Sequence, residues 1–444
     1  MKNEEKFKET KDWYLSNFEV FENKLNGQTE SYFHDYRKEA FEKFKGMNFP
    51  TIRDEEWKYT NVAPILRHNF IPVAKNVLDS DLENIENYFF KGFDHHRLVF
   101  INGIFDEKNS VVHKEAEGII ITNLADAIIN HSDILKKYSS RTKNPKTTFG
   151  AMNSVYSSDG IFIYAPENKI IEKPIQVLFF SGRREEKVLS SPKNIFIAEK
   201  NSQAKVVTVY TGIPDSVYFT NVTNEVFTEE NAILDIYKIQ NESEESFHID
   251  NTDAHQKRTS VFTHFSASIG ASILRNDINS ILDDEYALTN YFGLYLANDN
   301  QHMDNHTYVD HAKPNCESHE LYKGILDGRA RGVFNGKIMV REDAQKTNAY
   351  QSNKAILLSK EARVDTKPQL EIFADDVKCS HGATIGRLDD EAYFYIRSRG
   401  IPSELAKSML IHAFVSDVIE KIKIEPLREQ INHLIFEHLK RVEI

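Results

Sequence analysis

The sequence predicts a mainly β protein with helices at both ends. Between Phe149 and Val377, short apolar alternations such as IFIYAP, IQVLFF and KVVTVY follow one another and are separated by turn residues. A period of two is typical of strands that bury one face. The first ~70 residues and the residues after Gly400 instead carry apolar side chains at three- and four-residue spacing, which indicates amphipathic helices.

The length allows two or three domains, because 444 residues can bury a sizeable core. The polar, basic stretch SSRTKNPKTT reads as a surface connection and marks the first boundary. We therefore expect an N-terminal helical and mixed α/β domain at 1–148, a β core at 149–380 and a C-terminal helical domain at 381–444.

Composition excludes several classes of protein. A net charge of −12 argues against nucleic acid or an anionic membrane as the main partner. No run approaches the ~20 apolar residues of a membrane span, and MKNEEKFKETKDW is too charged for a signal peptide, so we expect a cytoplasmic protein. Two cysteines, Cys316 and Cys379, cannot build a disulfide framework, and no C-x-x-C pair is present.

The N-terminal helices carry aromatic stripes. LSNFEVFENKL and YFHDYRKEAFEKF each place Phe or Tyr along one face of a charged helix, and such stripes are usually core. Further on, LVFING and GIIITN read as strands and ADAIINHSDILKKY as a helix. Trp57 and Tyr59 lie between these regions in a polar segment that reads as an ordered loop.

The β core fits two architectures. Several strands begin from a small residue, at Ala204, Ala232, Ala271, Ala287 and Ala362, and these starts fall 16 to 75 residues apart. The uneven spacing favours an irregular β-solenoid or a sandwich with decorated loops over a strict repeat. A sandwich expects Asn-Gly hairpins, and Asn335-Gly336 is the one good match in this region. The residues alone therefore place the solenoid slightly ahead.

The segment QHMDNHTYVDHAKPNCESHELYKGIL is the densest collection of metal-capable side chains. On a strand, His302, Asp304 and His306 share one face, whereas His311 lies on the other. A His-Asp-His row could bind a divalent metal, but without a complete ligand set we favour a solvated strand face.

The stretch from Thr366 to Arg399 is the best candidate for chemistry. It opens as a strand, the pattern breaks at Gly382 to Gly386, and a helix from Leu388 ends at Gly400. Cys379 and His381 are two apart on the last strand, so both leave the same face and could form a soft-metal corner. The alternative is a buried cysteine beside a histidine that caps a loop.

Two helices complete the chain after Gly400. In the first, Leu405 and Met409 trace one side and Phe414 another, which makes an apolar surface wide enough both to pack on the body and to meet a partner. The alternative is a helical pair that caps the end of the solenoid.

The sequence carries no nucleotide-binding loop. GVFNGKI differs from a Walker A motif because three residues separate Gly332 from Gly336, and Ile338 replaces the metal-binding Ser or Thr. We expect no ATP hydrolysis by this chain. G-x-G-x-x-G, H-E-x-x-H and G-x-S-x-G motifs are also absent.

KCSHGATIG followed by LDDEAYFYIRSRGI resembles the C-terminal signature of the SufD branch of the SufB/SufD family, scaffold proteins of the Suf iron–sulfur cluster assembly machinery. EEWKYT, HAKPN and LYKGIL are also similar to stretches of that family. SufB proteins typically read H-E-A-T where this chain reads His381-Gly382-Ala383-Thr384, and this difference favours the SufD branch.

The resemblance implies a right-handed parallel β-helix and a non-ATPase scaffold. It implies pairing with a SufB-like subunit through the β-helices, with a homodimer when the chain is alone, and docking of the SufC ABC-type ATPase on the C-terminal helices at Leu405, Met409 and Phe414. A nascent iron–sulfur cluster or iron would be held transiently at the interface by His381, with Cys379 a weaker candidate. The resemblance also admits a reduced flavin on the complex.

Three other hypotheses remain open. The chain could be a SufB-like paralogue, a metalloenzyme that uses His302, His306 and His311, or a structural β-solenoid adaptor without metal chemistry.

Overall fold

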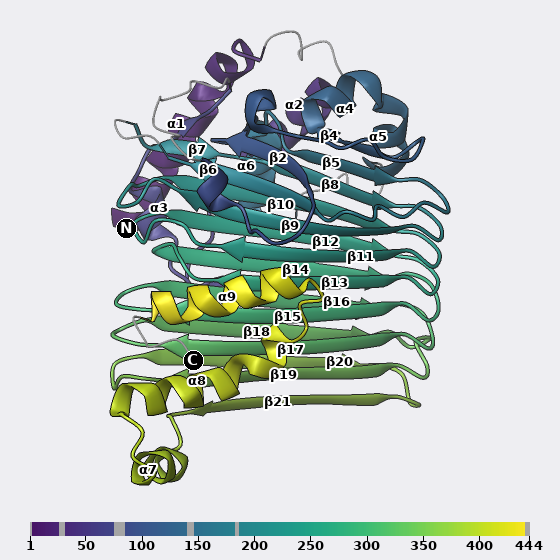
Figure 1. The fold of residues 1–444 in the computed structure, drawn as a ribbon. Coiled ribbons are helices and arrows are strands. Elements are labelled where there is room, and N and C mark those ends of the chain that lie inside the picture. The colour runs from purple at the N-terminus through teal and green to yellow at the C-terminus, as the bar shows by residue number, and fades with distance from the viewer. Residues whose placement is uncertain (1, 26–31, 75–84, 140–145, 183–185, 440–444) are drawn as a thin grey trace.

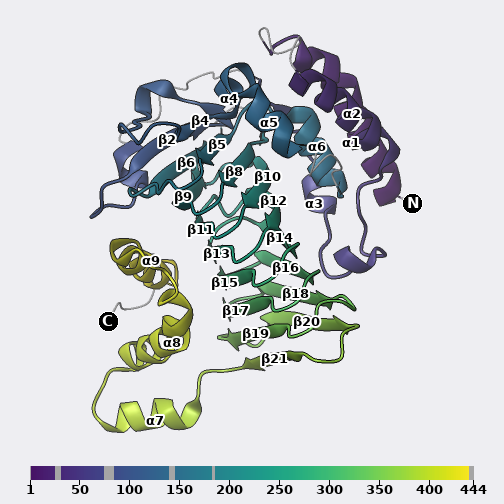
Figure 2. The same cartoon turned by 90° about the vertical axis from the view of Figure 1, so that its right-hand side faces the viewer.

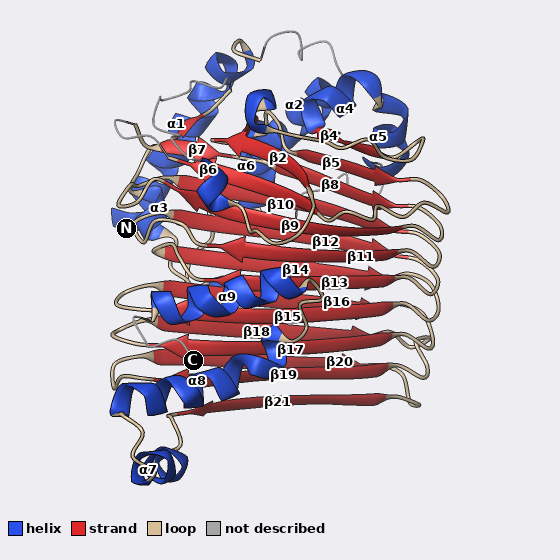
Figure 3. Cartoon of the chain, viewed as in Figure 1, coloured by secondary structure: helices blue, strands red, loops and turns tan. Residues whose placement is uncertain are grey.

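In the computed structural model, which describes residues 2–25, 32–74, 85–139, 146–182 and 186–439, the chain forms a β-solenoid with helices packed along it (Figures 1 and 3). Two sheets face each other across the solenoid. Sheet A contains β20 (Arg363–Ile372), β18 (Arg331–Val340), β16 (His302–His311), β14 (Ile273–Leu282), β12 (Phe247–Gln256), β10 (Phe219–Thr228), β8 (Lys193–Ala198), β5 (Ile161–Ala165) and β4 (Ile120–Asn123) in this order, with β1 (Ile71–Pro72) and β7 (Val188–Ser190) beside the main path. Sheet B contains β21 (Lys378–Gly386), β19 (Asn348–Leu357), β17 (Glu317–Leu326), β15 (Leu288–Ala297), β13 (Val261–Ser268), β11 (Ile233–Gln240), β9 (Gln203–Gly212), β6 (Ile175–Ser181), β2 (His96–Ile101) and β3 (Ile104–Phe105).

From β8 onward, each strand pairs in parallel with the strand two places later in the chain. One coil therefore contributes one strand to each sheet, which is the solenoid arrangement and not the hairpin arrangement of a sandwich. The residues paired between coils are from 26 positions apart, for Phe247 and Ile273, to 32 positions apart, for Arg331 and Arg363. The predicted β-solenoid is confirmed, and its repeat is tighter than the alanine positions indicated.

A column of turns from sheet A to sheet B explains that repeat. In each of these turns a residue with left-handed backbone, φ between 55° and 65°, precedes a small buried side chain: Asn201-Ser202, Asn231-Ala232, Thr259-Ser260, Tyr286-Ala287, Asn315-Cys316 and Lys346-Thr347. Only a small side chain fits inside such a tight corner. Serine, cysteine and threonine share this position with alanine, and of the five alanines in the sequence prediction only Ala232 and Ala287 occupy it. The other three lie within β9 or just before a strand of sheet A, so the alanine positions alone give an uneven spacing.

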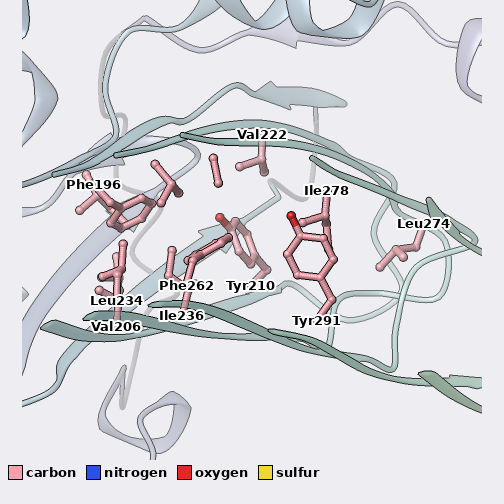
Figure 4. Packing of buried hydrophobic residues seen from close by; sticks show 14 of the residues in the cluster. Phe196, Val206, Tyr210, Val222, Leu234, Ile236, Phe262, Leu274, Ile278 and Tyr291 are labelled. Carbon is pink, nitrogen blue, oxygen red and sulfur yellow. The ribbon is translucent and has the colours of Figure 1, made fainter. Parts of the chain in front are cut away.

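Apolar side chains from both sheets fill the solenoid (Figure 4). Phe196 of sheet A lies opposite Val206 and Leu234 of sheet B in this core, and Val222 belongs to the same cluster. Each fully buried side chain of this size contributes roughly 1.5–3 kcal/mol. The two sheets begin within residues 1–148, because β2 pairs with β6 and β4 pairs with β5, and the expected boundary between 380 and 381 falls inside β21.

The N-terminal helices cover the outer face of sheet A (Figure 2). These are α1 (Lys2–Glu22), α2 (Tyr32–Gly46), α3 (Ala63–Leu66) and α6 (Thr148–Tyr156). Tyr14, Phe18 and Phe44 share one buried cluster with Phe219 and Phe247, so the aromatic stripes are core as predicted.

Two helical segments differ from the prediction. Helix α6 lies in a region expected to carry no helix, and every one of its residues is buried, so it has no polar face to produce a helical period. The helix expected over ADAIINHSDILKKY is two helices, α4 (Leu124–Asn130) and α5 (Ser132–Ser139), separated at His131.

The C-terminal helices are α7 (Asp390–Ser398), α8 (Ser403–Ile419) and α9 (Glu425–His438). Ile411 and Val415 of α8 and Ile431 of α9 pack against Phe265 and Leu294 on the outer face of sheet B. The α8 and α9 pair therefore lies along the side of the solenoid and not across its end (Figure 2), contrary to the end-cap alternative. Among the described helices, none combines the length and apolar character that crossing a bilayer requires.

Candidate functional site

The solenoid ends at two neighbouring open edges. Strands β20 and β21 are the last members of sheets A and B, and each has a strand partner on one side among the described residues. Most of β21 is exposed, and Phe373, which follows β20, is 63% exposed. An edge strand presents backbone N–H and C=O groups that can pair with another chain. This end of the molecule therefore has the character of a docking surface.

Cys379 and His381 both lie on β21, as predicted, but the structure gives them different surroundings. Cys379 is half-buried and packs in a small cluster with Ala349 and Ala374. Burial raises the pKa of its thiol. His381 is exposed and lies in register with Gln351 of β19. The histidine is thus available to a partner, whereas the cysteine is partly occupied by packing.

The predicted break at Gly382 to Gly386 is wrong, because β21 continues in register with β19 as far as Gly386. Apart from the glycine itself and its two chain neighbours, no atom of the described residues lies within 4 Å of the place where a Cβ would stand at Gly382 or Gly386. These glycines therefore leave two positions of the open edge strand without side chains, which permits close approach of another backbone there.

Helix α7 projects beyond the last coil (Figures 1 and 2). The Asp389 side chain caps it by accepting the backbone N–H groups of Glu391 and Ala392 at 2.9 and 3.0 Å. The helix exposes Phe394 and Tyr395, at 73% and 59%. Large exposed aromatics beside an open edge extend the candidate docking surface.

The three residues predicted to dock an ATPase do not share one surface of α8. Phe414 packs toward the body, with the Lys323 ammonium 4.6 Å from the centre of its ring. Leu405 and Met409 are half-buried and belong to none of the buried clusters of the described residues. Only Leu405 and Met409 therefore remain as candidates for a contact surface.

In the row on the outer face of β16, Asp304 and His306 are buried and His302 is half-buried, so the expected solvated face is wrong. The segment EEWKYT lies over it. The hydroxyl of Thr60 donates a hydrogen bond to Asp304, and Thr60 Oγ1 lies 2.8 Å from His302 Nε2. Burial lowers the pKa of His302 to about 4.

Arg275 of β14 joins this row to the same segment. Its guanidinium lies 3.8 Å from the centre of the Trp57 ring and donates to Asp304 at 2.8 Å and to the Glu56 carbonyl at 2.7 Å. His306 Nε2 lies 3.0 Å from Asp304 Oδ1. These contacts hold the EEWKYT segment against the outer face of sheet A.

His311 is directed to the other side of β16, as predicted. Its Nε2 lies 2.9 Å from Ser318 Oγ, and burial lowers the pKa of its imidazole to about 3. It does not join His302 or His306. In the part of the chain that the structure describes, no group of three or more His, Cys, Asp or Glu side chains converges as metal ligands would.

Sequence reasoning missed a polar network inside the solenoid. Lys238 donates to Asp250 at 2.6 Å, to Asn276 at 2.8 Å and to His248 Nε2 at 2.9 Å. His248 Nδ1 in turn donates to Glu242 at 2.7 Å. On an alternating strand, an inward polar residue looks the same as an outward one, so the sequence offers no signal for this network.

Comparison with known proteins adds the family. A model described as the SufBD core domain of SUF system FeS cluster assembly matches residues 180–414, which is more than half of the chain, and the SufBD protein N-terminal region matches residues 8–177. The chain belongs to the SufBD family. The resemblance found in the sequence is thereby confirmed, and the family's role is iron–sulfur cluster assembly.

Curated SufBD relatives match this chain over most of its length. An iron–sulfur cluster assembly SufBD family protein of Synechocystis is 29% identical and covers 93% of this chain and 92% of its own length. The SufD proteins of Escherichia coli and Bacillus subtilis are 29% and 28% identical, over 86% and 73% of this chain and 87% and 75% of their own lengths.

Proposed function

We propose that this chain is a non-ATPase scaffold subunit of the Suf machinery, which pairs with a SufB-like solenoid at its open end and helps to build an iron–sulfur cluster there. The observation that carries the proposal is the position of His381, exposed on the terminal strand of a solenoid whose two sheets both end in open edges. A second solenoid with the same strand spacing could pair with both edges at once.

The donor set supports a shared site. A neutral imidazole can donate a lone pair to iron, but one histidine cannot hold a cluster that is normally bound by several thiolates. Cys379 is poorly suited to supply the thiolate, because burial raises the pKa of its thiol. The remaining ligands are therefore assigned to the partner, and the cluster is cargo that the assembled complex releases.

ATP hydrolysis is assigned to a separate SufC-like subunit. GVFNGKI lies within β18, so it lacks the loop before a helix with which phosphate-binding motifs surround a nucleotide. The half-buried Leu405 and Met409 of α8 are the proposed contact with that ATPase.

The test is co-purification of the tagged chain with SufB-like and SufC-like proteins from the same genome. The wild-type chain should retain both, whereas Phe373→Glu at the open end should lose the SufB-like protein. Ile129→Glu is the matched control, because Ile129 is 74% exposed on α4 near the opposite end (Figure 1). Retention of the SufB-like protein by both variants, or by neither, would contradict docking at the open end.

A further inference from the structure

A column of paired positions on the inner face of sheet B ends at His381. The paired positions are His264 with Tyr291, Tyr291 with Glu320, Glu320 with Gln351, and Gln351 with His381. Glu320 and Gln351 are each 3% exposed. Strand β19 lies between β17 and β21. Gln351 therefore has Glu320 on one side and His381, the candidate iron ligand, on the other.

The amide of Gln351 is held from two directions. Its Nε2 donates to Glu320 Oε2 at 3.3 Å, and the same carboxylate oxygen accepts the Thr307 hydroxyl at 2.6 Å. Gly336 of β18 lies opposite, and a Cβ added there would stand 2.2 Å from Gln351 Nε2 and 2.6 Å from its Cδ. Gly336, which belongs to the GVFNGKI segment, thus makes room for this amide.

Gln351 Oε1 is buried and accepts no hydrogen bond from the residues that the structure describes. Leaving such an acceptor unpaired costs roughly 1–3 kcal/mol. Because Nε2 of Gln351 already donates to Glu320, the atom of Gln351 that remains for His381 is Oε1, which is an acceptor. Adjacent strands are ~4.8 Å apart, which brings the imidazole of His381 within reach of this oxygen.

We infer that Gln351 is a positioning residue for His381: in the assembled complex its Oε1 accepts the N–H of one ring nitrogen and leaves the other nitrogen's lone pair for iron. This inference rests on the proposed role of His381 as an iron ligand. Histidines that bind metals almost always donate their second ring N–H to a fixed acceptor, which selects the tautomer and orients the ring.

The test compares Gln351→Leu, which removes the acceptor, with Gln351→Glu, which keeps one. Asn353→Leu is the matched control, because Asn353 faces the same interior from the same strand and is 1% exposed. Each chain, labelled with ¹⁵N-histidine, is assembled with unlabelled partners, and the His381 signals are identified by their loss in His381→Ala. The ¹⁵N shifts report the tautomer, and titration with Fe(II) reports affinity.

Gln351→Leu should change His381 from one tautomer to a mixture and weaken iron binding by roughly 10–100-fold. Gln351→Glu should preserve the single tautomer, and Asn353→Leu should match wild type in both measurements. Gly336→Ala should reproduce the tautomer change by displacing the amide. A wild-type His381 tautomer in Gln351→Leu would overturn the inference. If the tautomer changes but His381→Ala binds iron normally, the positioning contact stands and the proposed ligand role fails.

Discussion

The guanidinium of Arg275 lies over the ring of Trp57, with its central carbon 3.8 Å from the centre of that ring. The contact joins the middle of the solenoid to the segment that follows the N-terminal helices. Arg275 is 2% exposed, and its three acceptors include two carboxylates, Asp277 and Asp304.

Arg275→Met should therefore destabilise the protein by about 3–5 kcal/mol, because it leaves buried carboxylates without their cation. Chemical denaturation measures the change. Trp57→Phe is the matched milder variant, since a smaller aromatic ring keeps the apolar contact. If Arg275→Met unfolds at the wild-type denaturant concentration, the carboxylates do not depend on this cation.

Lys238 is another buried cation on which neighbouring groups depend. It is surrounded by Asp250, His248 and Asn276 inside the solenoid. Lys238→Met should cost about 3–5 kcal/mol in the free energy of unfolding, because Asp250 is left as a buried unpaired charge. The double variant Lys238→Met/Asp250→Asn should recover much of that loss. A double variant that is less stable than the single one would show that the pair is not the dominant interaction.

Glu320 should make stability depend on pH. Burial raises the pKa of its carboxyl to about 7, so between about pH 4.5 and 7 the folded chain holds a proton that the unfolded chain has released. The stabilisation from this group is complete below the unfolded pKa and is lost as pH rises through 7.

Glu320→Gln cannot titrate, so wild type should lose about 2–3 kcal/mol relative to this variant between pH 4.5 and 8. Denaturant unfolding of both proteins across that range gives the difference between their free energies of unfolding. The contributions of the buried histidines are the same in both proteins and cancel in this difference. A constant difference would mean that Glu320 is ionised in the fold at all these pH values.

The sequence predicted the strands of the core and the aromatic stripes under the N-terminal helices because these depend on local period, whereas the β-solenoid class was only slightly favoured by the residues and was implied by the family resemblance. It misjudged the repeat, because the buried corner position accepts any small side chain, as Ala232, Ser260 and Cys316 show. It also missed α6, whose burial on all sides removes the helical pattern.

The candidate site was predicted in part. The shared face of Cys379 and His381 follows from strand alternation, but the partners of that face come from distant coils. Gln351 and Glu320 reach the column through pairing between coils, which the sequence does not encode locally. For the same reason, the sequence predicts a solvated row from His302 to His306, whereas in the fold the EEWKYT segment covers it.

Met409 and Phe414 offer a contrast on one helix. Met409→Glu should abolish binding of the SufC-like ATPase and change the free energy of unfolding by only ~0.5 kcal/mol, because Met409 lies outside the buried clusters. Phe414→Glu should lower thermal stability, since its ring packs against the body beside Lys323. Pull-down of the ATPase and thermal unfolding separate the two. Equal loss of folding and binding in Met409→Glu would show that this residue is core.

The last prediction concerns the open end itself. His381→Ala should lower the iron and sulfide content of the co-purified complex without dissociating it, because one exposed side chain is lost while the paired strand edges remain. Cys379→Ser should have a smaller effect, since Cys379 is half-buried against Ala349 and Ala374 and burial raises the pKa of its thiol.

Metal and sulfide analysis measures the cluster content, and gel filtration of the same sample shows whether the complex stays assembled. Normal cluster content in His381→Ala would make the histidine structural. A complex that separates into subunits would instead show that His381 holds the interface, because the strand edges alone would then be too weak to keep the two solenoids together.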